Sequence, residues 1–502
     1  MANLFDICLG GKGGLDRPAL ETQDGERFSY GDLVADAGRM ANALRAAGVE
    51  PGDRVAVQVE KSARNLILYL ACLRAGAVYL PLNTAYTLPE LAYFVGDAEP
   101  RLIVCDPSTR AGVAEIAKGV GARVETLDER GSGSLAQLAL DQSPDFATVA
   151  CGPDDLAAIV YTSGTTGRSK GAMLSHDNLA SNASTLVEAW RFTSQDVLIH
   201  ALPIYHVHGL FVATNVLLLA GGSMLFLPKF DADAILALMP RATVLMGVPT
   251  FYTRLLKSPG LTRETTSHMR LFVSGSAPLL AETHRDWRAR TGHAILERYG
   301  MTETGMNVSN PYDGDRIAGT VGLPLPGVEI RIRDPESGAD LAAGEIGMIE
   351  VRGPNVFKGY WRMPEKTAAE FRPGGWFITG DLGTVDPRGY VSIVGRGKDL
   401  IITGGLNVYP IEVEEEIDVL PGVVECAVVG LPHADFGEAV TAVVATGGAD
   451  GLNEAGVLAA LEGRLAAFKR PKRVIFVEEL PRNTMGKVQK AALRERYAAL
   501  YG

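Results

Sequence analysis

Cysteine is scarce in this sequence, with five residues among 502. The five are far apart and odd in number, and they form no Cys-x-x-Cys pair. This usage argues against a disulfide framework and against a cysteine zinc site. We therefore expect buried thiols in a reducing, cytoplasmic compartment: Cys8, Cys72, Cys105, Cys151 and Cys426.

An excess of basic residues is also lacking, because the net charge is −11. Nucleic acid is therefore not expected as a partner, although a local basic patch would still suit a phosphate-bearing ligand. The first 20 residues show neither a basic segment nor an apolar run, so no signal peptide is expected. The uncharged stretch Gly209–Pro228 approaches transmembrane length, but Gly221-Gly222 divides it into a helix and a strand. We expect it in the core, with no membrane insertion.

What the sequence does contain is an α/β texture. Over roughly the first 390 residues, apolar strand-like runs alternate with helical stretches, which predicts parallel sheets covered by helices. From Gly319 the sequence pattern predicts β-hairpins, and a compact βα pattern follows Gly395–Pro410. We predict an α/β protein with a large N-terminal domain (1–395) that includes a β-rich subdomain. The polar residues 396–399 suit a hinge, which would lead to a small α+β domain (400–502).

One short stretch, "YTSGTTGRSKG" (Tyr161–Gly171), is rich in glycine and hydroxyl residues. It follows the strand-like Leu156–Val160 and precedes Ala172–Trp190, which is predicted as a helix. Such a turn aims backbone N–H groups and hydroxyls at phosphate oxygens; a flexible surface turn is the alternative. It is not a Walker loop, because Arg168 follows Gly167 where that motif needs lysine.

This stretch closely resembles the signature of adenylate-forming enzymes, which include acyl-CoA synthetases. Four further stretches agree in order and spacing: "ERYGMTET" (297–304), "FITGD" (377–381), "GRGKDLIITGGLNVYPIEVE" (395–414) and "PRNTMGK" (481–487). The resemblance covers nearly the whole chain. It implies that a carboxylate attacks the α-phosphate of ATP to give acyl-AMP and pyrophosphate, and that CoA then displaces AMP.

The resemblance also implies roles for individual residues. Glu303 would bind Mg²⁺, Thr302 the α-phosphate and Asp381 the ribose diol, while Lys487 would bridge the attacking carboxylate and the α-phosphate. The full set expected at ATP or AMP is Thr162, Ser163, Gly164, Thr165, Thr166, Gly167, Lys170, Ser276, Ala277, Pro278, Arg298, Tyr299, Gly300, Met301, Thr302, Asp381, Arg396 and Lys487.

In this family the small domain is mobile: it swings between the two half-reactions, with the pivot at Lys398 or Asp399, and withdraws the lysine. Acetylation of Lys487 by a lysine acetyltransferase, reversed by a deacetylase, would remove its charge. The face presented to CoA would include Gly404, Gly405 and Leu406, together with the basic residues Lys469, Arg470 and Lys472. For the basic residues, a solvated charge run is an equal alternative.

His206 aligns with the family's gate between the acyl pocket and the thiol tunnel, which suggests a catalytic role. His206 and His208 would share one face of a strand, but no carboxylate or cysteine lies nearby to complete a metal site.

The acid is suggested by Arg254, Arg298 and Ser276, which fall on segments that wall the acyl pocket in relatives. Two guanidiniums and a hydroxyl suit a second carboxylate, unless the arginines pair with acidic neighbours. Together with "HVHGL" and "GVPTFY", these residues resemble malonyl-CoA synthetases. We expect malonate as substrate, with methylmalonate tolerated. Another short-chain acid, or transfer to a carrier protein instead of CoA, is the alternative.

Overall fold

The computed structural model of the chain describes residues 3–10, 14–162, 169–404, 406–447, 452–483 and 486–501. The chain folds into two compact units. The first consists of Met1–Glu329 and Val351–Phe377, and the second of Ile330–Glu350 and Ile378–Gly502. The α/β class predicted from the sequence is confirmed, since the first unit is built on two large mixed sheets and the second is a smaller α+β unit.

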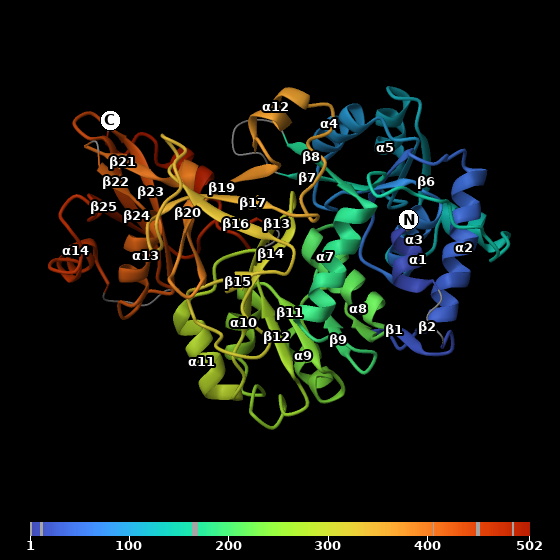
Figure 1. Cartoon of the computed structure of the whole chain (residues 1–502), viewed down its shortest axis with the longest axis horizontal. Coiled ribbons are helices and arrows are strands. Elements are labelled where there is room, and N and C mark those ends of the chain that lie inside the picture. Colours follow the sequence, from blue (N-terminus) through green and yellow to red (C-terminus); the bar gives the residue numbers. More distant parts are fainter. Residues whose placement is uncertain are drawn as a thin grey trace. The chain divides into compact units, whose positions relative to one another are not determined.

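A six-stranded sheet holds the N-terminal part of the first unit, drawn in blue and cyan in Figure 1. Its strands are parallel except for the last, β8, which runs antiparallel to β7. In order across the sheet they are β6 (Arg123–Thr126), β5 (Leu102–Cys105), β3 (Arg54–Gln58), β4 (Val78–Pro81), β7 (Leu156–Thr162) and β8 (Lys170–Ser175).

A nine-stranded sheet forms the remainder of this unit. Its central strands are parallel, while β2 at one edge and β14 and β15 at the other are antiparallel to their neighbours. In order they are β15 (Leu323–Pro324), β14 (Gly305–Ser309), β13 (Leu296–Met301), β12 (Leu271–Ser274), β11 (Val244–Gly247), β9 (Val197–His200), β10 (Ser223–Phe226), β1 (Pro18–Thr22) and β2 (Arg27–Ser29).

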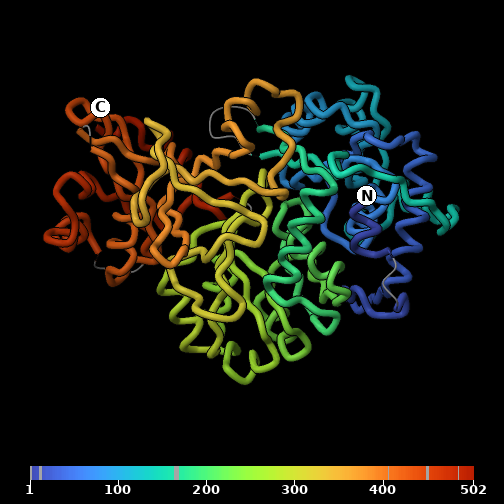
Figure 2. Tube along the Cα trace, viewed as in Figure 1, coloured from blue at the N-terminus to red at the C-terminus, as the bar shows by residue number. Residues whose placement is uncertain are grey.

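Helices cover both sheets, and α1, α3, α7 and α8 pack on one another between them; Figure 2 follows the same chain path as a tube. The helices are α1 (Leu4–Leu9), α2 (Tyr30–Ala46), α3 (Ala63–Arg74), α4 (Leu88–Ala98), α5 (Arg110–Lys118), α6 (Ser134–Leu140), α7 (His176–Ala189), η1 (His208–Thr214), α8 (Asn215–Ala220), α9 (Ala232–Leu238), η2 (Met239–Arg241), α10 (Pro249–Leu256), α11 (Ala281–Thr291) and α12 (Pro364–Ala369).

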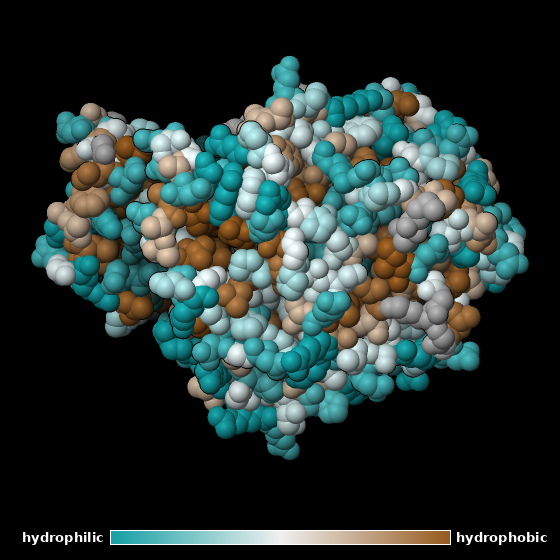
Figure 3. All heavy atoms as spheres, in the orientation of Figure 1, coloured by the Kyte–Doolittle hydropathy of each residue, from teal (hydrophilic) through white to brown (hydrophobic). Residues whose placement is uncertain are grey.

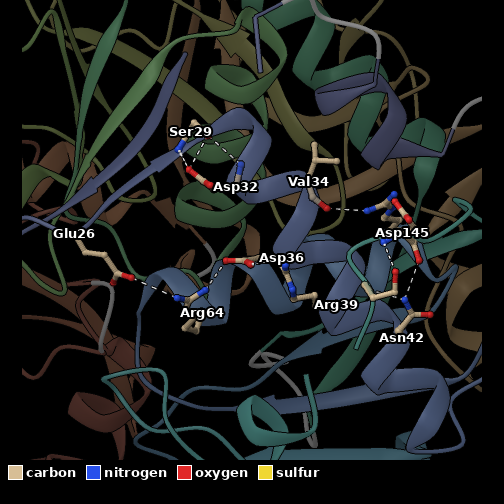
Figure 4. A network of polar contacts seen from close by, with 11 residues as sticks. Glu26, Ser29, Asp32, Val34, Asp36, Arg39, Asn42, Arg64 and Asp145 are labelled. Carbon is tan, nitrogen blue, oxygen red and sulfur yellow. Dashed lines mark hydrogen bonds and ion pairs between the residues drawn. The ribbon is translucent and has the colours of Figure 1, made fainter. Parts of the chain in front are cut away.

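Helix α2 shows how local sequence and tertiary contacts fix one helix. Ser29 and Asp32 form a capping box at its start, which satisfies backbone N–H groups that the first turn leaves free. Arg64 of α3 reaches Asp36 at 2.6 Å, and the same arginine extends toward Glu26 (Figure 4). The polar face of α2 is thereby tied to the following helix.

The uncharged stretch 209–228 is core, as its glycine break suggested. Helix α8 ends at Ala220, Gly221 adopts a left-handed conformation, and β10 begins at Ser223. Among the described residues, no helix combines the length and the hydropathy needed to cross a membrane. Hydrophilic residues dominate the face drawn in Figure 3, where hydrophobic ones form separate groups.

The second unit contains most of a five-stranded sheet and all of another. The first has the order β16 (Glu329–Arg333), β17 (Gly347–Arg352), β19 (Trp376–Val385) and β18 (Phe371–Arg372), with β20 (Val391–Arg396) also on β19. The second has the order β22 (Leu406–Val408), β21 (Ile401–Thr403), β24 (Gly437–Ala445) and β23 (Glu425–His433), with β25 (Arg473–Val477) also on β24. The short helices are η3 (Gly397–Asp399), α13 (Pro410–Asp418), α14 (Glu454–Ala460) and α15 (Lys490–Arg496).

Strands β23 and β24 bury both of their faces. Val428 and Val440 pack into one hydrophobic cluster with α13, while Val429 and Val443 pack into a second cluster with Leu493 of α15. Successive side chains of a strand point to opposite faces, so near-continuous apolar runs such as these suit a sheet covered on both sides.

Candidate active site

The predicted phosphate loop joins two antiparallel strands. Thr162, at the end of β7, pairs in register with Lys170, the first residue of β8. The residues between them that were predicted to contact ATP, Ser163, Gly164, Thr165, Thr166 and Gly167, lie outside the described residues. The helix predicted from Ala172 begins later, at His176, because the first residues after the loop form β8.

Lys170 begins a chain of polar contacts within the first unit. Its Nζ lies 3.2 Å from Glu370 Oε1 and 4.1 Å from the centre of the Tyr360 ring. The Tyr360 hydroxyl in turn lies 2.6 Å from Glu370 Oε2 and 3.0 Å from Glu303 Oε1. Burial and the two carboxylates raise the pKa of Tyr360, so it stays a neutral donor. Lys170 and the predicted cation ligand Glu303 are thus connected through the carboxylate of Glu370 and the hydroxyl of Tyr360.

The turn that carries Thr302 and Glu303 is held rigidly between β13 and β14. Glu303 is buried, and its carbonyl accepts a 2.8 Å hydrogen bond from the N–H of Phe357. Asn355 Nδ2 donates to the carbonyl of Thr304 at 2.7 Å, and Asn182 exchanges two hydrogen bonds with the backbone of Met306. These contacts fix the turn before any nucleotide arrives.

Sequence reasoning missed Tyr360, Glu370, Asn355 and Asn182. Their partners are distant in the chain: 57 residues separate Tyr360 from Glu303, and 200 separate Glu370 from Lys170. No local pattern marks them, because each side chain acts on a segment that is distant in the chain.

Arg298 is buried at the end of the site where the acid is expected. It is 3% exposed, and its Nε and Nη2 have no hydrogen-bond partner among the described residues. Burial lowers its pKa to about 9, so the guanidinium is charged at neutral pH. A β-carbon on Gly275 would lie 2.4 Å from the guanidinium carbon, so a larger residue there would displace the guanidinium from this position. An unpaired buried cation of this kind is costly and fits a site for an anion.

His208 and Ser276 lie beside this arginine, and His206 lies near His208. Ser276, in a left-handed conformation at φ 71°, has its Oγ 3.3 Å from His208 Nδ1. Burial, with Arg298 adding to it, holds the pKa of His208 well below its ordinary value. Burial also lowers the pKa of His206 to about 4, and its Nε2 has no partner within the described chain. Both rings are therefore neutral at physiological pH.

Arg254 is in a different environment. It lies in the last turn of α10, is exposed, and places its guanidinium 5.6 Å from the centre of the Phe230 ring. Phe230 in turn stacks near Phe251, with the ring centres 4.4 Å apart. The two predicted carboxylate-binding arginines thus differ. Arg298 is buried and has no partner for Nε and Nη2 in the described part of the chain, whereas Arg254 is at the surface beside an aromatic pair.

Within the second unit, Asp381 and Arg396 lie opposite each other on β19 and β20. Asp381 is buried, and its Oδ1 lies 2.7 Å from Arg396 Nε. Its N–H donates to Thr379 Oγ1, which fixes the backbone at this point. The carboxylate predicted for the ribose is therefore held in a single orientation.

Lys487 belongs to the same cluster. Its side chain keeps an exposed surface, yet desolvation lowers its pKa, as do the charges of Arg396 and Lys398, against the opposing effect of Asp381. Asp399 of the predicted hinge is paired with Arg494 at 2.5 Å. Cations outnumber carboxylates in this cluster, as a nucleotide site requires.

The residues predicted to meet CoA are described only in part. Lys469 is paired with Glu412 at 2.8 Å, Arg470 with Glu462 at 3.3 Å, and Lys472 lies 5.1 Å from the centre of the Phe436 ring. Gly404 donates its N–H to the carbonyl of Phe436, Leu406 is exposed, and Gly405 lies outside the described residues. Two of the three basic side chains thus have partners within their own unit.

A magnesium ion fits the donor set around Glu303. Within the described ranges, no group of three His, Cys, Asp or Glu side chains is arranged to hold a metal ion. Mg²⁺ is commonly held by one or two carboxylates together with the substrate's phosphates. The buried carboxylate of Glu303, linked through Tyr360 and Glu370 to Lys170, suits such an ion.

Comparison with known proteins agrees with this geometry. A feruloyl-CoA synthase of an Amycolatopsis species is 38% identical over 94% of each chain. A malonate–CoA ligase of Arabidopsis thaliana is 36% identical over 96% of this chain and 86% of its own. The ATP-bound crystal structure of MatB from Rhodopseudomonas palustris is 68% identical, covers 100% of this chain and 99% of its own, and has a TM-score of 0.98.

The family models cover most of the sequence. The AMP-binding enzyme model matches residues 11–361, and the AMP-binding enzyme C-terminal domain matches residues 412–487. Together these ranges contain the phosphate loop, the turn of Glu303 and the lysine at 487. The chain therefore belongs to the AMP-binding enzyme family.

Proposed function

We propose that this protein is a malonate–CoA ligase that also accepts methylmalonate. The observation that carries the proposal is the buried guanidinium of Arg298, whose Nε and Nη2 have no partner among the described residues. A feruloyl-type substrate would bring a neutral aromatic ring to this cation, whereas malonate brings a second carboxylate that pairs with it. The similarity to the malonate–CoA ligase of Arabidopsis thaliana and to MatB supports this proposal.

The reaction would proceed in two steps. One carboxylate of malonate attacks the α-phosphorus of ATP, and the bond to the bridging oxygen breaks to release pyrophosphate. The thiolate of CoA then attacks the carbonyl carbon of malonyl-AMP, and AMP leaves. Both substrates of the first step are anions, so positioning and charge neutralisation account for most of the catalysis.

Residues of the first unit would bind the acid and the phosphates. Arg298 and Ser276, with Arg254 at the surface, would hold the distal carboxylate. Thr302 would donate to the α-phosphate, and Lys170 would leave Glu370 to contact the β- and γ-phosphates. Glu303 would hold Mg²⁺, which supplies charge neutralisation when bound. His206, neutral because it is buried, would separate the acyl pocket from the path of the thiol.

In the second unit, Asp381 would accept hydrogen bonds from the ribose diol and Arg396 would approach the ribose or the phosphate. Lys487 would offset the charge that develops between carboxylate and phosphate. The domain boundary at 396–399, with Lys398 and Asp399 as the pivot, would let this lysine withdraw before CoA reacts. Gly404–Leu406 and the basic run from Lys469 to Lys472 would then face CoA.

Two further features belong to this proposal. All five cysteines are free and buried, which suits a reducing cytoplasmic compartment. The exposed position of Lys487 suits acetylation and deacetylation, which would switch off adenylation by removing the charge.

A panel of acids with ATP, Mg²⁺ and CoA tests the function. We expect malonate to yield malonyl-CoA, AMP and pyrophosphate, with methylmalonate next and with propionate and ferulate far behind. Formation of ADP and phosphate would reject the adenylate mechanism, and a preference for ferulate would reject the dicarboxylate.

A further inference from the structure

Lys61 is a buried lysine of the first unit. It lies in the loop between β3 and α3 and is 8% exposed. Its Nζ donates to the carbonyl of His200 at 2.7 Å and lies 2.9 Å from His200 Nδ1. The Phe226 ring lies 4.2 Å away, and no carboxylate of the described chain is within ion-pair distance. Burying an amino group in this way is costly, which favours a role for Lys61 beyond packing.

The His200 ring links Lys61 to Gly209 through its two nitrogens. Its Nε2 lies 2.9 Å from the carbonyl oxygen of Gly209 and 3.2 Å from Thr214 Oγ1. A carbonyl can only accept a hydrogen bond, so Nε2 carries the proton and Nδ1 accepts from Lys61. Burial, with the nearby lysine adding to it, keeps the pKa of His200 well below its ordinary value and the ring neutral.

Gly209 lies in η1, the π-helical turn His208–Thr214. Thr214 Oγ1 also donates to the Gly209 carbonyl at 3.0 Å, so two side chains share this acceptor. On the other side, a β-carbon at Gly209 would lie 2.0 Å from the carbonyl oxygen of Pro203. The widened turn is therefore fixed from both sides, and π-helical turns of this kind often occur at functional sites.

The same turn carries the residues next to the acid. It begins at His208, whose Nδ1 meets Ser276 Oγ, and the N–H of Leu210 donates to the carbonyl of His206. A continuous set of contacts thus leads from Lys61 through His200 and Gly209 to His208 and Ser276 beside Arg298. It also joins the loop after β3 of the six-stranded sheet to β9 of the nine-stranded sheet.

We infer that Lys61 is a positioning residue for acid recognition: by orienting His200 it holds the π-helical turn that places His208 and Ser276 beside the distal carboxylate. The inference rests on the proposed function. It adds that the choice of acid depends on a lysine that contacts neither the acid nor ATP.

The substitution Lys61→Met tests this, because methionine keeps the contact with Phe226 and removes the hydrogen-bond donors. Leaving one buried acceptor without a donor corresponds to a loss of ~10-fold. We expect the KM for malonate to rise ~10-fold and the malonate-to-propionate preference to fall by a similar factor, with the KM for ATP within ~2-fold of wild type. Lys118→Met is the matched control, since it removes an exposed lysine that is paired with Glu115 on the same helix and should change nothing.

Thr214→Val is a second variant, which keeps the side-chain shape and deletes the other donor to Gly209. It should shift the acid preference in the same direction. If Lys61→Met does not fold, this variant tests whether the π-helical turn controls the acid preference. A preference within ~2-fold of wild type in the folded variants, or equal losses for malonate, propionate and ATP, would overturn the inference. A wild-type enzyme that does not prefer malonate would instead overturn the proposed function, a separate result from the same measurements.

Discussion

At the scale of single residues, the two arginines predicted to bind the acid are expected to differ in importance. Removing Arg298 would leave the distal carboxylate of bound malonate buried and unpaired. Breaking a buried ion pair typically costs ~3–5 kcal/mol, and residual water reduces this to about 2–4 kcal/mol. The kcat/KM for malonate should therefore fall roughly 30- to 1,000-fold in Arg298→Ala. Propionate, which lacks the second carboxylate, should lose far less.

Arg254→Ala is the matched comparison. Arg254 is exposed, and exposed ion pairs contribute ~0–1 kcal/mol, so the loss for malonate should stay below about 5-fold. Measuring kcat/KM for malonate and propionate in both variants separates acid recognition from a general defect. An unchanged acid preference in Arg298→Ala would contradict the dicarboxylate assignment.

At the scale of elements, the turn between β13 and β14 depends on a glycine. A β-carbon on Gly300 would lie 2.0 Å from the carbonyl oxygen of Gly305, so the backbone must shift and move Thr302 and Glu303. We expect Gly300→Ala to lower the adenylation rate by at least ~10-fold, as displacement of charge-stabilising groups does. Gly96→Ala in α4 is the control, because its β-carbon meets no atom within 4 Å. Wild-type ATP–pyrophosphate exchange in Gly300→Ala would refute the rigid-turn argument.

The junction between α1 and α7 should make stability depend on pH. His176 Nδ1 accepts a 3.0 Å hydrogen bond from the N–H of Leu4, and burial lowers the pKa of His176 to about 4. The unfolded chain therefore binds this proton near pH 6.5 while the folded chain does not, so stability present above pH 6.5 is lost as the pH falls toward 4.

His176→Gln should remove this dependence. Wild type should lose about 2–3 kcal/mol more than the variant between pH 7 and pH 4.5. Urea unfolding at both pH values measures the difference, and parallel losses in the two proteins would show that His176 is not responsible.

The same scale shows where sequence reasoning succeeds. Asp381 and Arg396 are found by motif because each lies in a short local pattern, and the structure pairs them at 2.7 Å. The part of β8 from Ala172 onward was predicted as helix, because its apolar run is continuous with α7 and only pairing with β7 makes it a strand. Lys61 and Asn355 were missed for a related reason. Each works through a partner at least 48 residues away, which no local pattern reveals.

At the scale of the whole molecule, the proposal is that one polypeptide performs two reactions by moving Lys487. Lys487→Ala should lower adenylation by ~10²–10³-fold, because it removes a charge that stabilises the transition state. Preformed malonyl-AMP and CoA should still react at close to the wild-type rate, since the lysine has withdrawn by then. Lys490→Ala is the control: it removes a nearby lysine that is paired with Glu414 at 2.6 Å.

The pH dependence of adenylation is an independent test of the role of Lys487. Desolvation lowers the pKa of Lys487, so its charge is present at low pH and is lost as the pH rises through a value below the ordinary 10.5. Adenylation by wild type should decline over that range, and the decline should be absent from the residual activity of Lys487→Ala. Stopped-flow measurement of each half-reaction between pH 7 and pH 10 provides both tests. Equal losses in the two half-reactions would mean that Lys487 serves both, and the domain-alternation mechanism would then be wrong for this enzyme.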